Sequence, residues 1–180
     1  SQLVDSASGI HPRHSRYYIR RVRGDKKDPI TTFLQEKGVP SEECVLRPES
    51  TIVFSFPKKA PDSALLRDDL TAIEHLDLWM MYQKDWCEHK PSVTISVKED
   101  EWVEVGAWCW KNFDDISGVS FLPYDGGTYK QAPYEECTEE QYNELLNKMP
   151  MTLFWDELIE EDDNVEGVQQ LACTAGVCEI

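Results

Sequence analysis

The chain has 180 residues and a formal net charge of -16, and 41% of its residues are hydrophobic, with six Trp, seven Tyr and six Phe. This composition supports a packed core and excludes a disordered chain, and no apolar run reaches the roughly 20 residues of a membrane helix. The acidic excess argues against nucleic-acid binding, because phosphates would be repelled. The length fits one domain, or a large piece of a bigger one. The absence of a basic-then-apolar leader predicts a cytoplasmic protein.

The charge is distributed unevenly along the chain. Residues 1–30 carry seven basic and three acidic side chains, whereas residues 133–180 carry thirteen acidic side chains and one lysine. The first segment is suited to an anion such as a phosphate, and the last to a basic partner surface. The basic segment contains two histidines, His11 and His14, and five arginines, which are Arg13, Arg16, Arg20, Arg21 and Arg23. Either this run lies near substrate phosphates or a subunit contact, or it forms a solvated face with ion pairs; we favour the second.

The hydrophobic patterns predict strands and helices in alternation after a loop-like start. In chain order we expect a short helix at 31–38 with Gly38 as its cap, a strand at 50–57 that Pro57 ends, a helix at 66–86, a strand at 91–97, a helix at 100–112, and a strand at 117–127 that runs into a glycine-rich turn. In the helix at 100–112, the stripe of Val103, Ala107 and Trp110 is expected in the core, rather than as a platform for a cofactor.

This order of elements is typical of parallel βα units. Right-handed crossovers would place both long helices on one side of the sheet. Three strands are too few to close a barrel, and a parallel sheet needs cover on both faces. The sequence therefore predicts either a small open α/β sheet or part of a larger barrel.

The last part of the chain differs in composition. Thr138–Gln141 reads TEEQ, a capping box that predicts a final helix ending near Pro150. The following residues are acidic, with one amphipathic turn around Phe154, and the end has no periodicity. We therefore divide the chain into residues 1–150, which belong to the α/β fold, and residues 151–180, which form an acidic spacer and a mobile tail.

The six cysteines lack the spacing of a zinc site, so no metal site is predicted. Cys87 and His89 are too few ligands to bind a metal. We expect three further cysteines to be reduced and structural: Cys44, Cys109 and Cys137. Cys173 and Cys178 stand near the end with four residues between them. They are either idle thiols or a redox pair.

Several long stretches of the chain carry a family resemblance. These stretches are SASGIHPRHSRYYIRRVRGDKKDP, STIVFSFPKKAP, LWMMYQKDWCEHKPSVTISVKEDEW, SFLPYDGGTYKQAPYEECTEEQY and the end LACTAGVCEI. They resemble the C-terminal quarter of the class II ribonucleotide reductases, which depend on adenosylcobalamin. The resemblance covers the whole chain in the right order. Class I large subunits share the layout around IHPRHSRYYIRRV and also end in a cysteine pair, so a class I fragment is the alternative.

The resemblance implies the last strands and helices of a ten-stranded α/β barrel followed by a flexible tail. It also implies a role in converting ribonucleoside triphosphates to deoxyribonucleotides for DNA synthesis. The radical-bearing cysteine, the cysteines that reduce the ribose, and most of the cobalamin and effector sites would lie upstream, so the chain alone should be inactive. In the family the loop that holds the substrate phosphates ends just before Ser1, which makes Ser1 and Gln2 candidate substrate-binding residues.

The resemblance also gives the tail a role as a reductant shuttle. Each turnover would leave a buried disulfide in the active site, and Cys173 and Cys178 would reduce it by thiol–disulfide exchange and then be reduced by thioredoxin. The implied partners are an upstream reductase polypeptide, thioredoxin or a similar reductant, and the nucleotide substrate and effector, with no membrane and no nucleic acid.

The sequence leaves other matters open. A non-enzymatic assembly module with an acidic docking tail is an alternative from another class, which cooperative unfolding of the isolated chain as a monomer would favour. A barrel fragment should instead expose apolar edges and faces. The origin of Ser1 (a split gene, an intein junction or an expression fragment), the oligomeric state, the effector and the choice of triphosphate over diphosphate are not determined by the residues.

Overall fold

A computed structural model describes residues 9–124 and 130–159 of the chain. The chain forms two compact units. Unit 1 comprises Ser1–Tyr18 and Lys59–Thr128, and unit 2 comprises Ile19–Lys58 and Tyr129–Ile180. Both contain helices and strands, so the predicted α/β class is confirmed. The predicted division at residue 150 stays a prediction.

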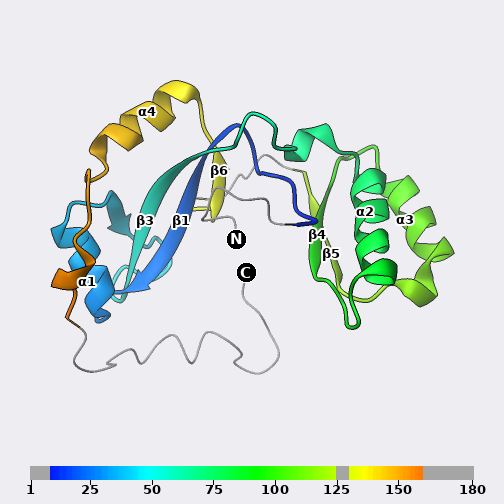
Figure 1. Ribbon diagram of the computed structural model, residues 1–180, viewed down its shortest axis with the longest axis horizontal. Coiled ribbons are helices and arrows are strands. Elements are labelled where there is room, and N and C mark those ends of the chain that lie inside the picture. Colours follow the sequence, from blue (N-terminus) through cyan, green and yellow to red (C-terminus); the bar gives the residue numbers. More distant parts are fainter. Residues whose placement is uncertain (1–8, 125–129, 160–180) are drawn as a thin grey trace. The chain divides into compact units, whose positions relative to one another are not determined.

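Unit 1 is built on two parallel strands. β4 (Val93–Val97) pairs with β5 (Val119–Pro123) in parallel, in a register that runs from Val93 opposite Val119 to Val97 opposite Pro123. Figure 1 shows α2 (Ala72–Asp85) and α3 (Trp102–Lys111) on the same side of this pair, as the sequence predicts for a right-handed crossover. Two short 3₁₀ turns, η1 (Arg67–Asp69) and η2 (Phe113–Asp115), complete the unit.

The core of unit 1 lies between α2, α3 and β4. The alternation of β4 is confirmed, because Val93, Ile95 and Val97 are buried while Thr94 is exposed. Trp79 of α2 is fully buried, and its indole N–H donates to the Pro91 carbonyl over 2.7 Å. This bond satisfies the one polar atom of the largest core side chain and fixes the entry of β4.

Two details of the predicted helices are corrected. The helix expected at 66–86 begins only at Ala72, because Thr71 forms a capping box with Glu74. The stripe expected in the core of α3 is also wrong: Val103 and Trp110 are 86% and 85% exposed, and Val105 is the buried residue. The helix is apolar on more than one side, so periodicity alone selected the wrong face.

Unit 2 contains most of a four-stranded sheet in the order β2-β3-β1-β6. Its strands are β1 (Tyr17–Asp25), β2 (Ser41–Glu43), β3 (Thr51–Lys59) and β6 (Tyr134–Glu136). A small core of Val39, Ile52 and Phe54 lies against this sheet. The helices are α1 (Pro29–Glu36) and α4 (Glu139–Lys148), and a 3₁₀ turn η3 spans Trp155–Glu157.

The local end signals of both helices of unit 2 behave as expected. Gly38 has φ of +80° just after α1, which is the left-handed position that its predicted role as a cap requires. In α4, the Thr138 hydroxyl accepts from the Gln141 N–H, and the Gln141 side chain accepts from the Thr138 N–H. The predicted capping box is confirmed.

The predicted succession of three parallel strands is corrected. β3 does not join β4 and β5, but pairs with β2 in antiparallel, with Ser41 opposite Phe54. β3 also continues through Pro57 to Lys59. The Ser55 N–H donates to the Pro40 carbonyl, which is the last backbone bond of β3 on the β2 side. Pro57 lies two residues further on the same side, beyond the end of β2, so its missing N–H costs no bond to that strand.

The helices of the described ranges are short, and α2 is the longest at 14 residues. Among the described residues, none of the helices has both the length and the apolar character needed to cross a bilayer.

Candidate functional site

The carboxyl edge of the β4–β5 pair brings several polar side chains of unit 1 together. Ligands of parallel α/β sheets bind outside the carboxyl ends of the strands. Lys98 follows β4 and Tyr124 follows β5, and the Tyr124 N–H donates to the Val97 carbonyl over 2.8 Å. This edge is therefore the first place to look for a site.

Tyr124 is tied to the η1 turn by two side chains. Its hydroxyl donates to the Asp68 carboxylate and accepts from the Arg67 guanidinium at 3.3 Å. The Arg67 guanidinium also lies 4.3 Å from the centre of the Tyr124 ring, and the Lys98 ammonium lies 5.9 Å from it. Burial and the bond to Asp68 raise the pKa of Tyr124, so the phenol keeps its proton.

The segment that begins at Gly9 is held against the same edge by its backbone. The Arg13 N–H donates to the Leu65 carbonyl at 2.9 Å, and the Arg67 N–H donates to the Arg13 carbonyl at 2.8 Å. Near its start, buried His75 of α2 donates from Nε2 to the Ile10 carbonyl over 2.6 Å, since a carbonyl can only accept. These three bonds connect the predicted basic segment to η1 and α2.

Two histidines of this region favour the neutral form. Burial, assisted by the positive charge of Arg67, lowers the pKa of His14 to about 4. Burial also lowers the pKa of His75, against the opposing effect of its bond to Ile10. His14 therefore offers an uncharged imidazole, and not a cation, beside Arg67 at neutral pH.

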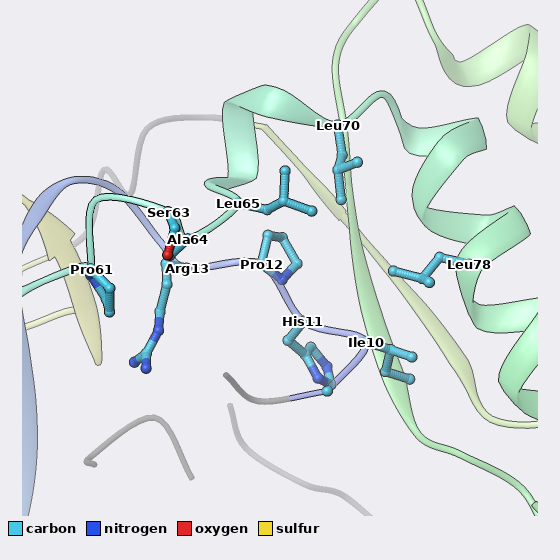
Figure 2. A pocket seen from close by; sticks show the side chains of 11 residues that line it. Ile10, His11, Pro12, Arg13, Pro61, Ser63, Ala64, Leu65, Leu70 and Leu78 are labelled. Atoms are coloured by element: carbon cyan, nitrogen blue, oxygen red, sulfur yellow. The ribbon is translucent and has the colours of Figure 1, made fainter. Parts of the chain in front are cut away.

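A cavity of about 470 Å³ lies between this segment and the start of α2. Figure 2 shows the side chains of Pro12, Leu65, Leu70 and Leu78 around a common space, with His11 below them. The remaining lining residues are Gly9, Ile10, Arg13, Pro61, Ser63 and Ala64. Mostly apolar walls with a few polar groups, and a volume in this range, suit a small molecule or part of one.

The arginines of the basic segment chiefly bind backbone carbonyls. In unit 1, Arg16 donates to the carbonyls of Ala60, Pro61 and Asp62 at 2.6–3.3 Å, which fixes the chain beside the cavity. It also lies 3.7 Å from the Asp62 carboxylate.

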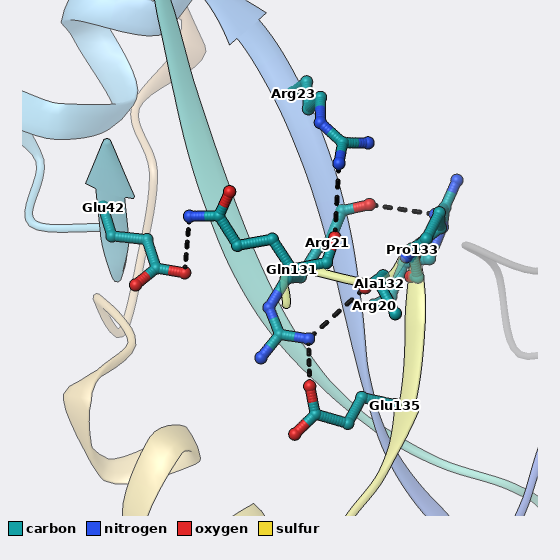
Figure 3. Close-up of polar contacts among 8 residues, drawn as sticks. All are labelled: Arg20, Arg21, Arg23, Glu42, Gln131, Ala132, Pro133 and Glu135. Atoms are coloured by element: carbon teal, nitrogen blue, oxygen red, sulfur yellow. Dashed lines mark hydrogen bonds and ion pairs between the residues drawn. The ribbon is translucent and has the colours of Figure 1, made fainter. Parts of the chain in front are cut away.

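The arginines of β1 have the same role in unit 2. Figure 3 shows Arg20 and Arg21 directed at the carbonyls of Pro133 and Ala132, and Arg21 forms an ion pair with Glu135. Of the two hypotheses for this run, an ion-paired face is closer to the structure. Arg16, Arg20 and Arg21, however, are partly buried and bind backbone carbonyls, rather than forming a fully solvated surface.

Gln131 is the centre of a second polar cluster in unit 2. It is buried and has φ of +59°, the left-handed region, which costs a non-glycine residue roughly 1–2 kcal/mol. Its side-chain oxygen accepts from the Val45 N–H at 2.9 Å, and its side-chain N–H groups donate to the Glu43 carbonyl and the Glu42 carboxylate at 2.7 and 3.0 Å. Three hydrogen bonds hold the strained backbone in place.

The candidate residues predicted from the sequence lie outside the described residues. They are Ser1 and Gln2 at one end and Cys173 and Cys178 at the other. The predicted glycine-rich turn at 125–129 lies outside them as well. Their positions and contacts stay predictions.

The four cysteines in the described ranges are unpaired thiols, as expected. Burial raises the pKa of Cys109 and, together with Glu135 and Glu136, that of Cys137, so neither thiol is activated. Burial raises the pKa of Cys44, but backbone hydrogen bonds from Arg47 and Leu46, together with the side chain and charge of Arg23, outweigh this effect and lower it. Within the described ranges, no three His, Cys, Asp or Glu side chains gather as a metal site.

Sequence reasoning missed Asp68, Tyr124 and Gln131. Tyr124 had a partial signal, since it lies near the end of the predicted strand at 117–127, at what becomes the carboxyl edge of a parallel sheet. Asp68 fell within the predicted helix at 66–86, whereas in the structure it lies in the turn before that helix begins. Gln131 carried no signal, because a left-handed backbone at a non-glycine residue depends on distant partners.

Comparisons with known proteins agree with the sequence motifs. No family model matches the chain. The chain is 31% identical over 180 residues to the adenosylcobalamin-dependent ribonucleoside-triphosphate reductase of Euglena gracilis, and 28% identical over 186 residues to that of Lactobacillus gasseri. These alignments cover 99% and 100% of the chain, but the chain spans only about 25% of each relative's length.

A solved structure shares the fold. It is a crystal structure of a B12-dependent (class II) ribonucleotide reductase, with a TM-score of 0.64 and 24% identity over 80% of this chain and 20% of that one. The resemblance to part of the class II reductases, predicted from the motifs, is thus confirmed.

Proposed function

We propose, from the similarity of the chain along its whole length to part of the class II reductases, that it is the C-terminal part of an adenosylcobalamin-dependent ribonucleoside-triphosphate reductase. The complete enzyme would convert ribonucleoside triphosphates to deoxyribonucleotides for DNA synthesis in the cytoplasm. The observation that carries this proposal is a match over 99% of the chain to a relative about four times as long. A part of this size would be inactive alone.

The architecture of unit 1 supports a place in a larger barrel. Parallel sheets occur almost only with several strands and with both faces covered, and an isolated pair of strands is marginal. In the described ranges β4 and β5 pair only with each other, and β4 leaves Thr94 exposed on the face opposite the core, a face that a parallel sheet normally has covered. The ten-stranded barrel of the family would supply strands at both edges.

The carboxyl edge of unit 1 would form part of the active-site wall. The cavity of unit 1 is lined by residues 9–13, a segment that comes shortly after Ser1 and Gln2, the candidate phosphate-binding residues, in the sequence. Neutral His14 and the Arg67–Tyr124–Asp68 cluster would provide a fixed polar border, since their partners already hold them in place.

The cofactor does not fit the described residues of this chain. Adenosylcobalamin is far larger than the ligands that cavities of roughly 300–1,000 Å³ enclose. The cavity of about 470 Å³ is at the lower end of this range, and no cluster of potential metal ligands accompanies it among the residues that the structure describes. The cofactor would therefore be bound mainly by the part of the reductase that this chain does not span.

The tail would carry electrons to the active site. A thiolate of Cys173 or Cys178 would attack the active-site disulfide and form a mixed disulfide. The second tail thiol would then attack the tail sulfur of this mixed disulfide and release the active-site thiol. This leaves a Cys173–Cys178 disulfide and two reduced active-site thiols. Thioredoxin, or a similar dithiol, would reduce the tail disulfide and become oxidised. The attachment to the enzyme keeps the dithiol at an effective concentration on the order of millimolar.

Cofactor dependence of the complete enzyme tests the proposal. The protein that contains this chain is purified from its native source. It should also contain the remaining reductase sequence. It should form deoxyribonucleotides from ribonucleoside triphosphates only when adenosylcobalamin is added. Activity without cobalamin, but with a radical-generating small subunit, would assign the chain to class I. The absence of any reductase sequence or activity would favour an assembly module.

A further inference from the structure

We propose that the exposed apolar face of α3 is a docking surface for the part of the reductase that this chain does not span. The surface, here called the α3 face, consists of Trp102, Val103, Gly106, Ala107, Trp110 and Phe113. The inference rests on the proposed function, because it takes its partner from there. It names where unit 1 would contact that partner, and through which chemistry.

The two sides of α3 differ in burial. Val105 is 3% exposed and packs in the core of unit 1 with Trp108, at positions that repeat on one side of the helix. On the opposite side, residues 103, 106, 107 and 110 follow the i, i+3, i+4, i+7 spacing of one stripe. Val103, Trp110 and, just beyond the helix, Phe113 are 86%, 85% and 73% exposed.

The composition of the α3 face is that of a covered surface. A helix with apolar residues on both sides is normally buried, and a group of adjoining exposed apolar side chains, unlike a single one, is typical of an interface. At the centre of the stripe, Gly106 and Ala107 are small, and a Cβ added at Gly106 would meet no atom within 4 Å. The small residues Gly106 and Ala107 therefore leave open space between Val103 and Trp110, whose exposed side chains are suited to anchor a partner.

The size of the relatives points to the partner. The chain aligns over nearly its whole length to about 25% of the Euglena reductase, so roughly three quarters of a reductase of that length lie outside it. Unit 1 also holds a two-stranded parallel sheet, which needs protein contacts beyond the described residues. We therefore expect an apolar segment of the remaining reductase polypeptide to lie on the α3 face.

The chain offers a matched internal reference for a test. Trp86, at the C-terminal end of α2 in the same unit, is 81% exposed, nearly as much as Trp110, but lies on another helix. Hydroxyl-radical labelling of the native complete reductase, read by mass spectrometry, compares the two indoles in one sample. If the α3 face is covered, Trp110 should be labelled several-fold less than Trp86. Equal labelling, or weaker labelling of Trp86, would overturn the inference.

Substitutions in the complete enzyme give a second readout. Trp110→Glu should lower the midpoint of thermal unfolding of the assembled reductase, because it places a carboxylate in an apolar contact. Trp86→Glu should change it little. Equal effects of the two substitutions would contradict a docking surface on α3.

The test separates the inference from the proposed function and from a second copy as the partner. A preparation that reduces ribonucleotides with adenosylcobalamin but labels Trp110 and Trp86 equally would overturn only the docking surface. A preparation without that activity would overturn the proposed function. Protection of Trp110 that disappears on dilution, as sedimentation shows dissociation into single copies, would assign the face to contact between copies and would also overturn the inference.

Discussion

At the scale of single residues, buried polar side chains hold the loops of both units. Gln131 shows this most clearly, because its side-chain hydrogen bonds all go to the segment at residues 42–45, far away in sequence. Such a residue is important for stability even though it carries no charge.

We therefore expect Gln131→Ala to destabilise unit 2 by about 1–3 kcal/mol, because the part-buried bonds to the Val45 N–H and the Glu43 carbonyl are lost. Hydrogen exchange should show faster exchange at the Val45 amide, and chemical unfolding should show a lower midpoint. The neighbouring exposed residue gives the control, and Lys130→Ala should stay within about 0.5 kcal/mol of the original protein. Unchanged exchange at Val45 would contradict the observed hydrogen bond.

The neutral histidines of unit 1 predict a dependence of stability on pH. Since burial lowers the folded-state pKa of His14 to about 4, from 6.5, the unfolded chain binds the proton more readily. Stability should therefore be complete above pH 6.5 and should fall as the pH decreases toward 4. His75 contributes in the same direction.

The effect is measured as the midpoint temperature of thermal unfolding at pH values from about 7.5 to about 4.5, in steps of about one pH unit. His14→Gln should make the unfolding temperature less dependent on pH, whereas His89→Gln, at an exposed position, should keep the original dependence. A steeper dependence in His14→Gln would mean that the sign is wrong. The nearby charges of Arg67 and Asp68 are unchanged in both variants.

At the scale of elements, the sequence predicted what short-range signals determine. The capping box at Thr138–Gln141 and the left-handed Gly38 depend on neighbours within a few residues, and both are confirmed. β1 was missed because its five-arginine neighbourhood reads as a polar loop. It becomes a strand through partners such as the 131–133 carbonyls, which are more than 100 residues away.

The face of α3 shows a different limit of sequence reasoning. A helix that is apolar on more than one side gives periodicity no means to choose the face that packs within the chain. Val105 packs inside, and the stripe of Val103 and Trp110 is left for another contact. The candidate tail residues could be named from the sequence by resemblance alone, whereas the cluster of Arg67, Asp68 and Tyr124 required the fold.

The α4 cap gives a prediction at this scale. Thr138→Ala should destabilise the helix by about 0.5–2 kcal/mol, because the Gln141 N–H loses its acceptor. Circular dichroism during urea unfolding measures the change. Thr152→Ala, at an exposed position outside the helices, is the control and should have almost no effect. Equal stability of the two variants would show that the box does not stabilise α4.

At the scale of the whole molecule, the chain has the features of one part of a larger protein. Its parallel strands, its uncovered helix face and its match to a quarter of longer relatives are consistent with one another. In this account the chain contributes a wall of the active site at one end and a source of electrons at the other. The tail dithiol is the feature that would make it a working part of the reductase.

Turnover of the complete enzyme with two different reductants tests this account most directly. Cys173→Ser or Cys178→Ser should reduce thioredoxin-driven deoxyribonucleotide formation to background, because either change prevents the tail disulfide from forming. Turnover driven by a small dithiol that reaches the active site directly should persist in both variants, and Cys87→Ser should keep both activities. Equal loss with the two reductants, or full thioredoxin-driven activity in the tail variants, would contradict the account.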